Sequence, residues 1–250
     1  MINSILQVLT TKSRHKTKFF CLNSGNCGSK YLVHLLKANG VEDCYHEKNP
    51  DLDLTGVHYY LSNQYSPIIK SILLLTRIGV HIESSNRLFS LAPLLKEVFS
   101  NSKFIHLHRS GVASVRSSVN KTLWPEVMQH ATRLRYASEL AGSSKLDPFK
   151  RTCHYWTNIN ERIVEDLSGI DSDDVLSLRF DDLISGNLDT LEAFLQTRLC
   201  QKSIDPVNTK EHLKSESARL LNSFSEWPND WKSTFLRVCG LLHQRMGYDL

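Results

Sequence analysis

The sequence lacks the cysteine patterns of a metal or redox site. Its six cysteines are scattered and none forms a CxxC pair, so zinc-binding and thioredoxin-type sites are not predicted. No other cluster of potential metal ligands is visible along the chain. A disulfide framework is not expected in 250 residues without a secretory segment. We therefore expect neither a metal nor a disulfide scaffold.

Targeting and membrane-spanning segments are also missing. The first twenty residues hold only a short apolar stretch with no basic segment before it, which fits neither a signal peptide nor a membrane span. The longest apolar run near the middle, Ile68–Val80, is interrupted by Lys70 and Arg77. These absences predict a cytoplasmic, soluble protein without a membrane partner.

The chain has no internal repeat, low-complexity segment or long linker, and 41% of its residues are hydrophobic. These features favour a single domain over residues 1–250. The first half, residues 1–125, carries 15 Lys and Arg against 7 Asp and Glu, whereas the second half carries 15 against 19. A basic half suits an anionic ligand. No basic stripe is interleaved with aromatics, so we do not expect a nucleic-acid partner.

Predicted strands alternate with predicted helices. Short apolar runs predict strands at residues 18–22, 43–47, 80–83, 103–108 and 175–180, and helical spacing predicts helices at 29–39, 68–77, 91–99, 112–120, 152–167, 188–199 and 231–246. This alternation is typical of a three-layer α/β sandwich, in which helices flank a central, mainly parallel sheet. Ligands of such sheets bind at the carboxyl ends of strands. We therefore expect a site in the loops after Leu22, Glu47, Glu83 and His108.

The loop after the first strand, NSGNCGSK at residues 23–30, has the composition of a phosphate-binding turn. Small residues let backbone N–H groups approach a phosphate, and the helix that follows adds partial positive charge. Ser29 adds a hydroxyl and Lys30 a full charge. The order Gly-Ser-Lys differs from the Gly-Lys-Ser/Thr of a Walker A loop, which disfavours a nucleoside triphosphatase. Taken alone, the loop is equally consistent with a strand-to-helix turn that binds nothing.

A second phosphate clamp is predicted after KFIHLH at residues 103–108. Arg109 comes at the carboxyl end of this strand, and Ser117 lies eight residues later, two turns into the next helix. Arginine offers a bidentate fork to a phosphate, and serine adds a hydroxyl. Either residue alone has an ordinary surface interpretation. The ordinary interpretation becomes much less favoured when both residues are considered together with the first loop.

These segments resemble a known family. FFCLNSGNCGSKYLVHLL and KFIHLHRSGVASVRSSVN resemble the 5′-phosphosulfate loop and the 3′-phosphate motif of sulfotransferases that use 3′-phosphoadenosine 5′-phosphosulfate (PAPS). VLSLRFDDL at residues 175–183 resembles the late strand and acidic helix start of the same family. The similarity spans roughly residues 18–199 and is weak beyond them.

The resemblance implies a fold like that of P-loop nucleoside triphosphate hydrolases and an enzyme that needs no metal. Such an enzyme transfers a sulfuryl group from PAPS to a hydroxyl or amine and releases 3′,5′-ADP. By position, the resemblance implies that Gly28, Ser29 and Lys30 hold the 5′-phosphosulfate, and that Arg109 and Ser117 hold the 3′-phosphate. The full set of donor-binding residues expected is Asn26, Cys27, Gly28, Ser29, Lys30, Tyr31, Arg109 and Ser117.

One position departs from the family pattern. Members of the family usually carry Lys or Arg three residues before the Ser or Thr of the loop, where it neutralises charge on the leaving phosphate. This sequence has Asn26 there. Lys30, on the first helical turn, is the candidate substitute in that catalytic role. The alternatives are a weaker enzyme or one that has lost catalysis.

The base that accepts the acceptor's proton has two carboxylate candidates. Glu47 follows the second predicted strand and resembles the base of the protein-tyrosine and carbohydrate branches. Glu83 ends the third predicted strand and resembles the glutamate of the heparan-type branches, although the lysine that usually follows is Ser84 here. We favour Glu47, because His46 beside it can tune or share the proton. Taken one by one, His46, His81 and His108 are each expected to have a structural or supporting role more than a catalytic one.

The acceptor is expected to be a carbohydrate or another small molecule. Its pocket and lid are assigned to residues 51–66 and 124–149, the least family-like segments. Aromatic and basic residues that could line the adenine or acceptor pockets, or serve only as core and surface, are Tyr31, Trp124, Arg133, Arg135 and Trp156. Two other functions remain open: a small-molecule kinase that uses ATP and magnesium, and a non-catalytic protein that binds 3′,5′-ADP.

Overall fold

The computed structural model describes residues 17–49, 67–120, 148–200 and 223–249. Its centre is a sheet of five strands, β1 (Lys18–Leu22), β2 (Cys44–His46), β3 (Ile82–Ser85), β4 (Ser102–His108) and β5 (Val175–Arg179). The strands lie in the order β2-β3-β1-β4-β5, and every neighbouring pair is parallel. The predicted parallel sheet is therefore confirmed.

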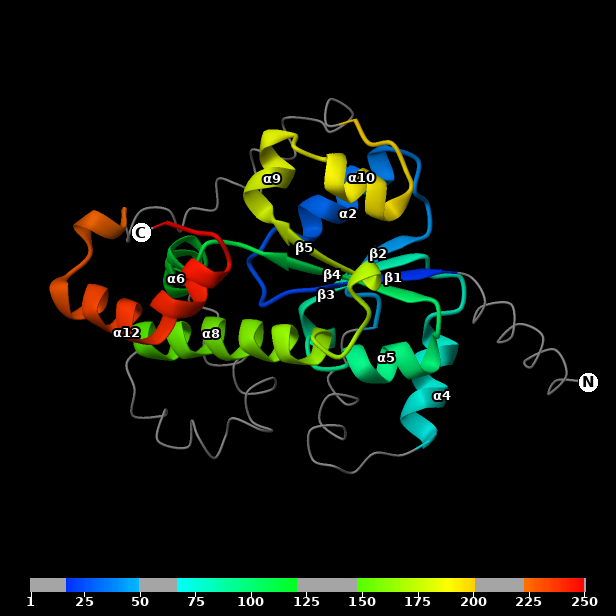
Figure 1. Cartoon of the computed structure of the whole chain (residues 1–250), viewed down its shortest axis with the longest axis horizontal. Helices are drawn as coiled ribbons and strands as arrows, with labels where there is room; N and C mark the ends of the chain where they lie inside the picture. Colours follow the sequence, from blue (N-terminus) through cyan, green and yellow to red (C-terminus); the bar gives the residue numbers. More distant parts are fainter. Residues whose placement is uncertain (1–16, 50–66, 121–147, 201–222, 250) are drawn as a thin grey trace, which may run out of the picture.

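Both faces of the sheet are buried. Successive residues of a strand point to opposite faces, and in β1 both sets pack against helices. Phe20 and Leu22 of β1 pack with apolar side chains of α4 (Pro67–Thr76), α5 (Ala92–Val98) and α8 (Pro148–Leu167). Phe19 and Cys21 pack on the other face with α2 (Ser29–Ala38), α9 (Phe180–Ser185) and α10 (Asp189–Leu195). The helices thus form two layers around the sheet, as Figure 1 shows. This arrangement confirms the predicted three-layer α/β fold.

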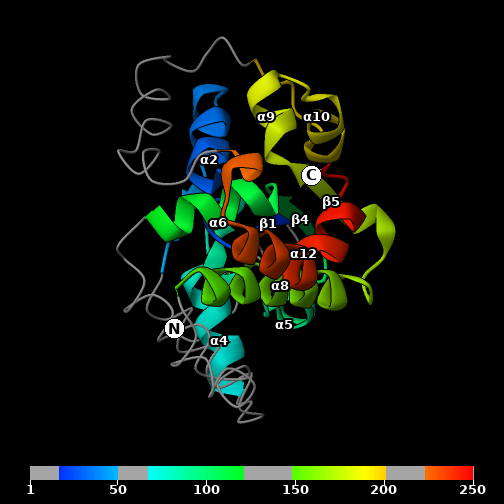
Figure 2. The same cartoon turned by 90° about the vertical axis from the view of Figure 1, so that its left-hand side faces the viewer.

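A third apolar cluster joins α8 to α6 (Gly111–Asn120) and α12 (Asn229–Arg245), the elements that lie side by side in Figure 2. Its buried members are Val115, Phe149, Cys153, Trp156, Trp227, Phe235, Cys239 and Leu242. Because α6 directly follows β4, this cluster anchors the helix that carries the predicted 3′-phosphate motif. Short 3-10 turns, η1 (Asn86–Leu88), η3 (Ser172–Asp174) and η6 (Phe224–Glu226), complete the described elements.

The end of the third strand differs from the prediction. Strand β3 runs to Ser85, so Glu83 lies inside the strand and does not end it. Serines at positions 84 and 85 suggest a loop, but both are fully buried and pair with β1. The carboxylate of Glu83 therefore lies two residues deeper in the sheet than the sequence indicates.

Candidate active site

The loop between β1 and α2 has the backbone shape of a phosphate cradle. Three of its residues have left-handed φ angles: Gly25 (78°), Asn26 (53°) and Gly28 (86°). Helix α2 begins at Ser29, and the N–H groups of its first turn have no partner within the helix. A Cβ at Gly28 would lie 2.1 Å from ring carbons of Phe180. Only glycine fits there, both for its φ angle and for its space.

The two loops that the sequence indicates as phosphate sites touch each other. The side-chain amide of Asn26 donates from Nδ2 to Oγ of Ser118 on α6, at 2.9 Å. Arg109, which directly follows β4, donates from Nη1 to the carbonyl oxygen of Asn26 at 3.4 Å. Ser117, the predicted hydroxyl donor, is half-buried beside Ser118 on the same helix. A ligand with two phosphates could therefore meet both loops at once.

The guanidinium of Arg109 is held in place before any ligand arrives. Its Cζ lies 5.1 Å from the centroid of the Phe180 ring, within range of a cation–π contact. Burial is the largest influence on this group and lowers the pKa of Arg109 from its ordinary value. The side chain still remains charged at any ordinary pH. An anion bound beside it would offset the cost of burying that charge.

His46 and Glu47 lie at the carboxyl end of β2, beside the phosphate loop. Nε2 of His46 is 3.0 Å from Oγ of Ser29. Burial is the main cause that lowers the pKa of His46, the charge of Glu47 raises it, and the charge of Lys30 lowers it further. The imidazole is therefore uncharged at neutral pH and able to accept a proton. Glu47 has a left-handed φ of 48°, and its Oε2 lies 3.9 Å from Nε of Arg87.

Glu83 is placed very differently from Glu47. Its side chain and that of Arg77 are both fully buried, and Arg77 Nε lies 3.0 Å from Glu83 Oε2. Its other oxygen, Oε1, accepts from the backbone N–H of Lys48 at 3.3 Å. Breaking a buried pair of this kind by removing one partner is strongly destabilising. Glu83 is therefore surrounded as in a structural ion pair, inside strand β3.

Comparison with known proteins identifies the family. A family model described as the sulfotransferase family matches residues 4–197. The chain belongs to the sulfotransferase family. Among curated proteins, none matches the chain with significant sequence similarity.

Solved sulfotransferase structures share the fold of this sulfotransferase. The sulfotransferase domain from the curacin biosynthetic pathway has a TM-score of 0.55 at 17% identity, covering 95% of this chain and 99% of that domain. The sulfotransferase domain from the Synechococcus PCC 7002 olefin synthase has a TM-score of 0.51 at 15% identity, covering 94% and 97%. The Alicyclobacillus acidocaldarius sulfotransferase gives 0.51 at 14%, again covering 94% and 97%. At these identities the likeness establishes the fold.

The remaining predicted site residues of this sulfotransferase differ in their surroundings. Cys27 is fully buried, and burial raises the pKa of its thiol, so only its backbone is available to a ligand. Tyr31 is half-buried, its ring edge-on to Phe180 at 6.1 Å. Trp156 is buried in the α6–α8–α12 cluster, where it acts as core. Trp124, Arg133, Arg135 and the segments 51–66 and 124–147 lie outside the described residues.

Phe180 and Ser118 are site residues that the sequence predictions missed. Phe180 contacts Gly28 and Arg109 and is the first residue after β5. The rule that ligands bind at the carboxyl ends of strands applies to β5 as well, and following it would have indicated Phe180. Ser118 lies on the same face of α6 as the buried Ser114, four residues earlier. This spacing of four residues is the sequence signal that could have indicated Ser118.

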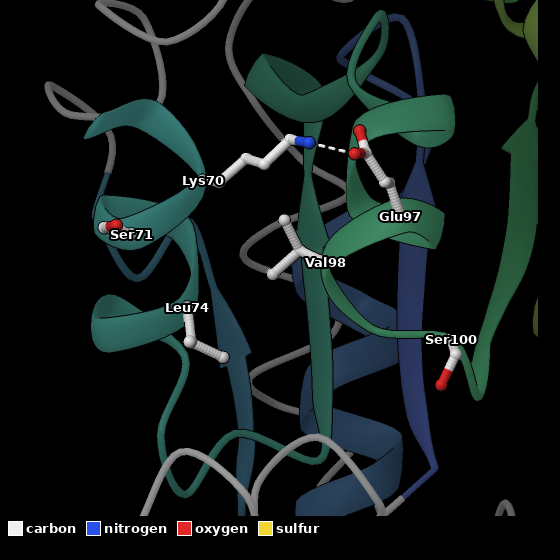
Figure 3. A pocket seen from close by; sticks show the side chains of 6 residues that line it. All are labelled: Lys70, Ser71, Leu74, Glu97, Val98 and Ser100. Atoms are coloured by element: carbon white, nitrogen blue, oxygen red, sulfur yellow. Dashed lines mark hydrogen bonds and ion pairs between the residues drawn. The ribbon is translucent and has the colours of Figure 1, made fainter. Parts of the chain in front are cut away.

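Each face of the sheet of this sulfotransferase has a hollow among the described residues. One, of about 630 Å³, lies between α2 and β2 and is lined by Lys30, Val33, His34, Lys37, Tyr45 and His46. The other, of about 380 Å³, lies between α4 and α5 on the opposite face of the sheet, where Lys70 and Glu97 form an ion pair across it (Figure 3). Only the first adjoins the phosphate loop. No described helix has the length and apolar character to cross a bilayer, and no described group of three or more His, Cys, Asp or Glu is placed to hold a metal.

Proposed function

We propose that this sulfotransferase takes the sulfuryl group from PAPS, transfers it to a hydroxyl or amine of an acceptor, and releases 3′,5′-ADP. The observation that carries the proposal is the contact between the loops after β1 and β4. Asn26 joins them through its carbonyl and its amide. A donor with a 5′-phosphosulfate and a 3′-phosphate is the kind of ligand that needs two such clamps in one site.

The residues divide into a donor side and an acceptor side. The N–H groups at the start of α2, with the hydroxyl of Ser29, would bind the 5′-phosphosulfate. Arg109, with Ser117 or Ser118, would bind the 3′-phosphate. These groups supply the positioning and charge stabilisation that transfer of a sulfuryl group requires, as in phosphoryl transfer.

His46 is proposed as the base, with Glu47 beside it. Its Nε2 lies against Ser29, close to the end of the loop where the sulfuryl group would sit. The acceptor oxygen would form a bond to sulfur while the bond from sulfur to the 5′-phosphate oxygen breaks. The proton of the acceptor hydroxyl passes to Nε2, and the leaving 3′,5′-ADP carries the electron pair. The negative charge of Glu47, which raises the pKa of His46, would stabilise the imidazolium.

The donor assignment is tested by thermal unfolding with 3′,5′-ADP, 5′-AMP and ATP–magnesium side by side. A ligand at about 100 times its Kd stabilises the folded state by roughly 2.7 kcal/mol. We expect the largest shift with 3′,5′-ADP, because it alone fills both clamps. A shift with ATP–magnesium and none with 3′,5′-ADP would favour a small-molecule kinase instead.

The base is tested with His46→Ala and Glu47→Gln, once an acceptor has been found by screening with radiolabelled PAPS. Loss of a general base costs on the order of 10²–10⁴ in rate. We expect that loss in His46→Ala and a smaller one in Glu47→Gln, with 3′,5′-ADP affinity within about threefold of wild type in both. The opposite ranking would make Glu47 the base. Binding of 3′,5′-ADP with no turnover on any acceptor would instead indicate a non-catalytic protein.

A further inference from the structure

The hollow between α2 and β2 is strongly basic. Lys30, His34 and Lys37 lie on one face of α2, at helical spacings of four and three residues. His46 closes the hollow from β2, where its Nε2 reaches Ser29 of the phosphate loop. None of the residues that line this hollow is acidic.

A tyrosine ring forms the wall opposite the lysines of α2. The ammonium Nζ of Lys48 lies 4.2 Å from the centroid of the Tyr45 ring, and that of Lys37 lies 5.8 Å from it. Both distances are within cation–π range. Both ammonium groups are thus held close to the Tyr45 ring, which forms part of the wall of the hollow.

The acidic neighbours are turned toward other partners. Glu47 follows His46 in the chain, but its Oε2 faces Nε of Arg87, 3.9 Å away. The lining of the hollow itself includes two lysines and no carboxylate, so its charge favours an anion over a cation.

We propose that this hollow binds an anionic group of the acceptor, a carboxylate, sulfate ester or phosphate ester, with Lys37 as its principal contact. The inference rests on the proposed function for the reaction, and it adds the chemical class of the acceptor. A volume of about 630 Å³ is in the range of small-molecule sites. It suits a sugar or similar ring whose charged substituent contacts the lysines.

The test uses four probes that differ only at carbon 6 of one sugar: glucose, glucuronate, glucose 6-phosphate and glucose 6-sulfate. Binding is measured by ligand-observed NMR, with and without saturating 3′,5′-ADP so that the phosphate clamps are either filled or open. We expect the three anions to bind in the presence of 3′,5′-ADP and glucose not to. Lys37→Glu should weaken the anions by up to about fivefold, since the upper end for one exposed ion pair, about 1 kcal/mol, corresponds to that factor.

The matched control is Arg237→Glu, which makes the same charge change on an exposed position of α12, a helix well separated from α2 in Figures 1 and 2. It should leave all four probes unchanged. The inference is overturned if glucose binds as well as the anions, if no anion binds at about 10 mM, or if both variants weaken the anions equally. If the wild-type protein binds the anions through Lys37 but does not bind 3′,5′-ADP, the proposed donor is overturned and this inference stands.

Discussion

Replacing Arg109 by alanine is the most direct perturbation of the 3′-phosphate clamp. The guanidinium is half-buried, rests on Phe180 and is anchored to the carbonyl of Asn26. Because the side chain is already ordered, binding a phosphate costs it little further entropy. The interaction should therefore have the value of a charged hydrogen bond, about 1.5–3 kcal/mol, and exceed that of an exposed ion pair, about 0–1 kcal/mol.

This range corresponds to a Kd for 3′,5′-ADP that rises about 10- to 150-fold in Arg109→Ala. Calorimetric titration with 3′,5′-ADP and with 5′-AMP, which lacks the 3′-phosphate, separates the clamp from general effects. The affinity for 5′-AMP should fall by clearly less than that for 3′,5′-ADP, since 5′-AMP has no 3′-phosphate to lose. Arg116→Ala removes a nearby charge on α6 that acts on Arg109. This control should weaken 3′,5′-ADP by less than about 1 kcal/mol.

Two results would refute the assignment of Arg109. Equal losses for 3′,5′-ADP and 5′-AMP would mean that the variant has disturbed the phosphate loop, through Asn26, and not a 3′-phosphate contact. An unchanged affinity for 3′,5′-ADP would mean that the guanidinium serves only to join the two loops.

Three further predictions follow from buried contacts. Gly28→Ala should lower the unfolding free energy by about 2–4 kcal/mol in urea titration, from overpacking against Phe180 and a left-handed φ; an unchanged midpoint would contradict the tight contact. Burial lowers the pKa of His106 to about 4 from its ordinary 6.5, so the unfolded chain binds the proton first and stability falls as pH drops below 6.5. His106→Gln can keep the hydrogen bond to Asn160 but has no imidazole to protonate. Between pH 7 and pH 5 its unfolding free energy should fall by about 2 kcal/mol less than that of the wild type. Equal falls in the two proteins would show that His106 is not the cause. Glu83→Gln should cost about 3–5 kcal/mol of stability, because the buried charge of Arg77 loses the carboxylate that compensates it; a loss below about 1 kcal/mol would reopen the candidacy of Glu83 as base.

The sheet was predictable because its strands are short apolar runs between helices of clear period. Each run that the sequence indicates overlaps one strand of the observed sheet, and the loops chosen by the carboxyl-end rule do border the candidate site. The alternation is a strong signal since both faces of a parallel sheet must be buried. Glycine and serine after β1 add the local signal for the turn into α2.

Tertiary contacts explain what the sequence did not indicate. Glu83 looks like a strand-end acid, and only the fold brings Arg77 against it. The buried Lys18 donates to the carbonyls of Arg77 and Val80, partners that lie some sixty residues away. Phe180 reads as an ordinary core aromatic until β5 places it on Gly28. Each of these roles depends on a pairing across the sheet that local patterns do not encode.

The departure at Asn26 has a physical explanation in the same contacts. Its φ of 53° is left-handed, a conformation that asparagine tolerates better than lysine or arginine. The side-chain amide of Asn26 donates a hydrogen bond to Ser118, and its backbone carbonyl accepts one from Arg109. The loop therefore gains a positive charge from β4 at the position where its own side chain is neutral. If that charge replaces the missing basic residue, Arg109 serves both the 3′-phosphate and the leaving group, and Arg109→Ala should reduce turnover by more than its effect on 3′,5′-ADP affinity.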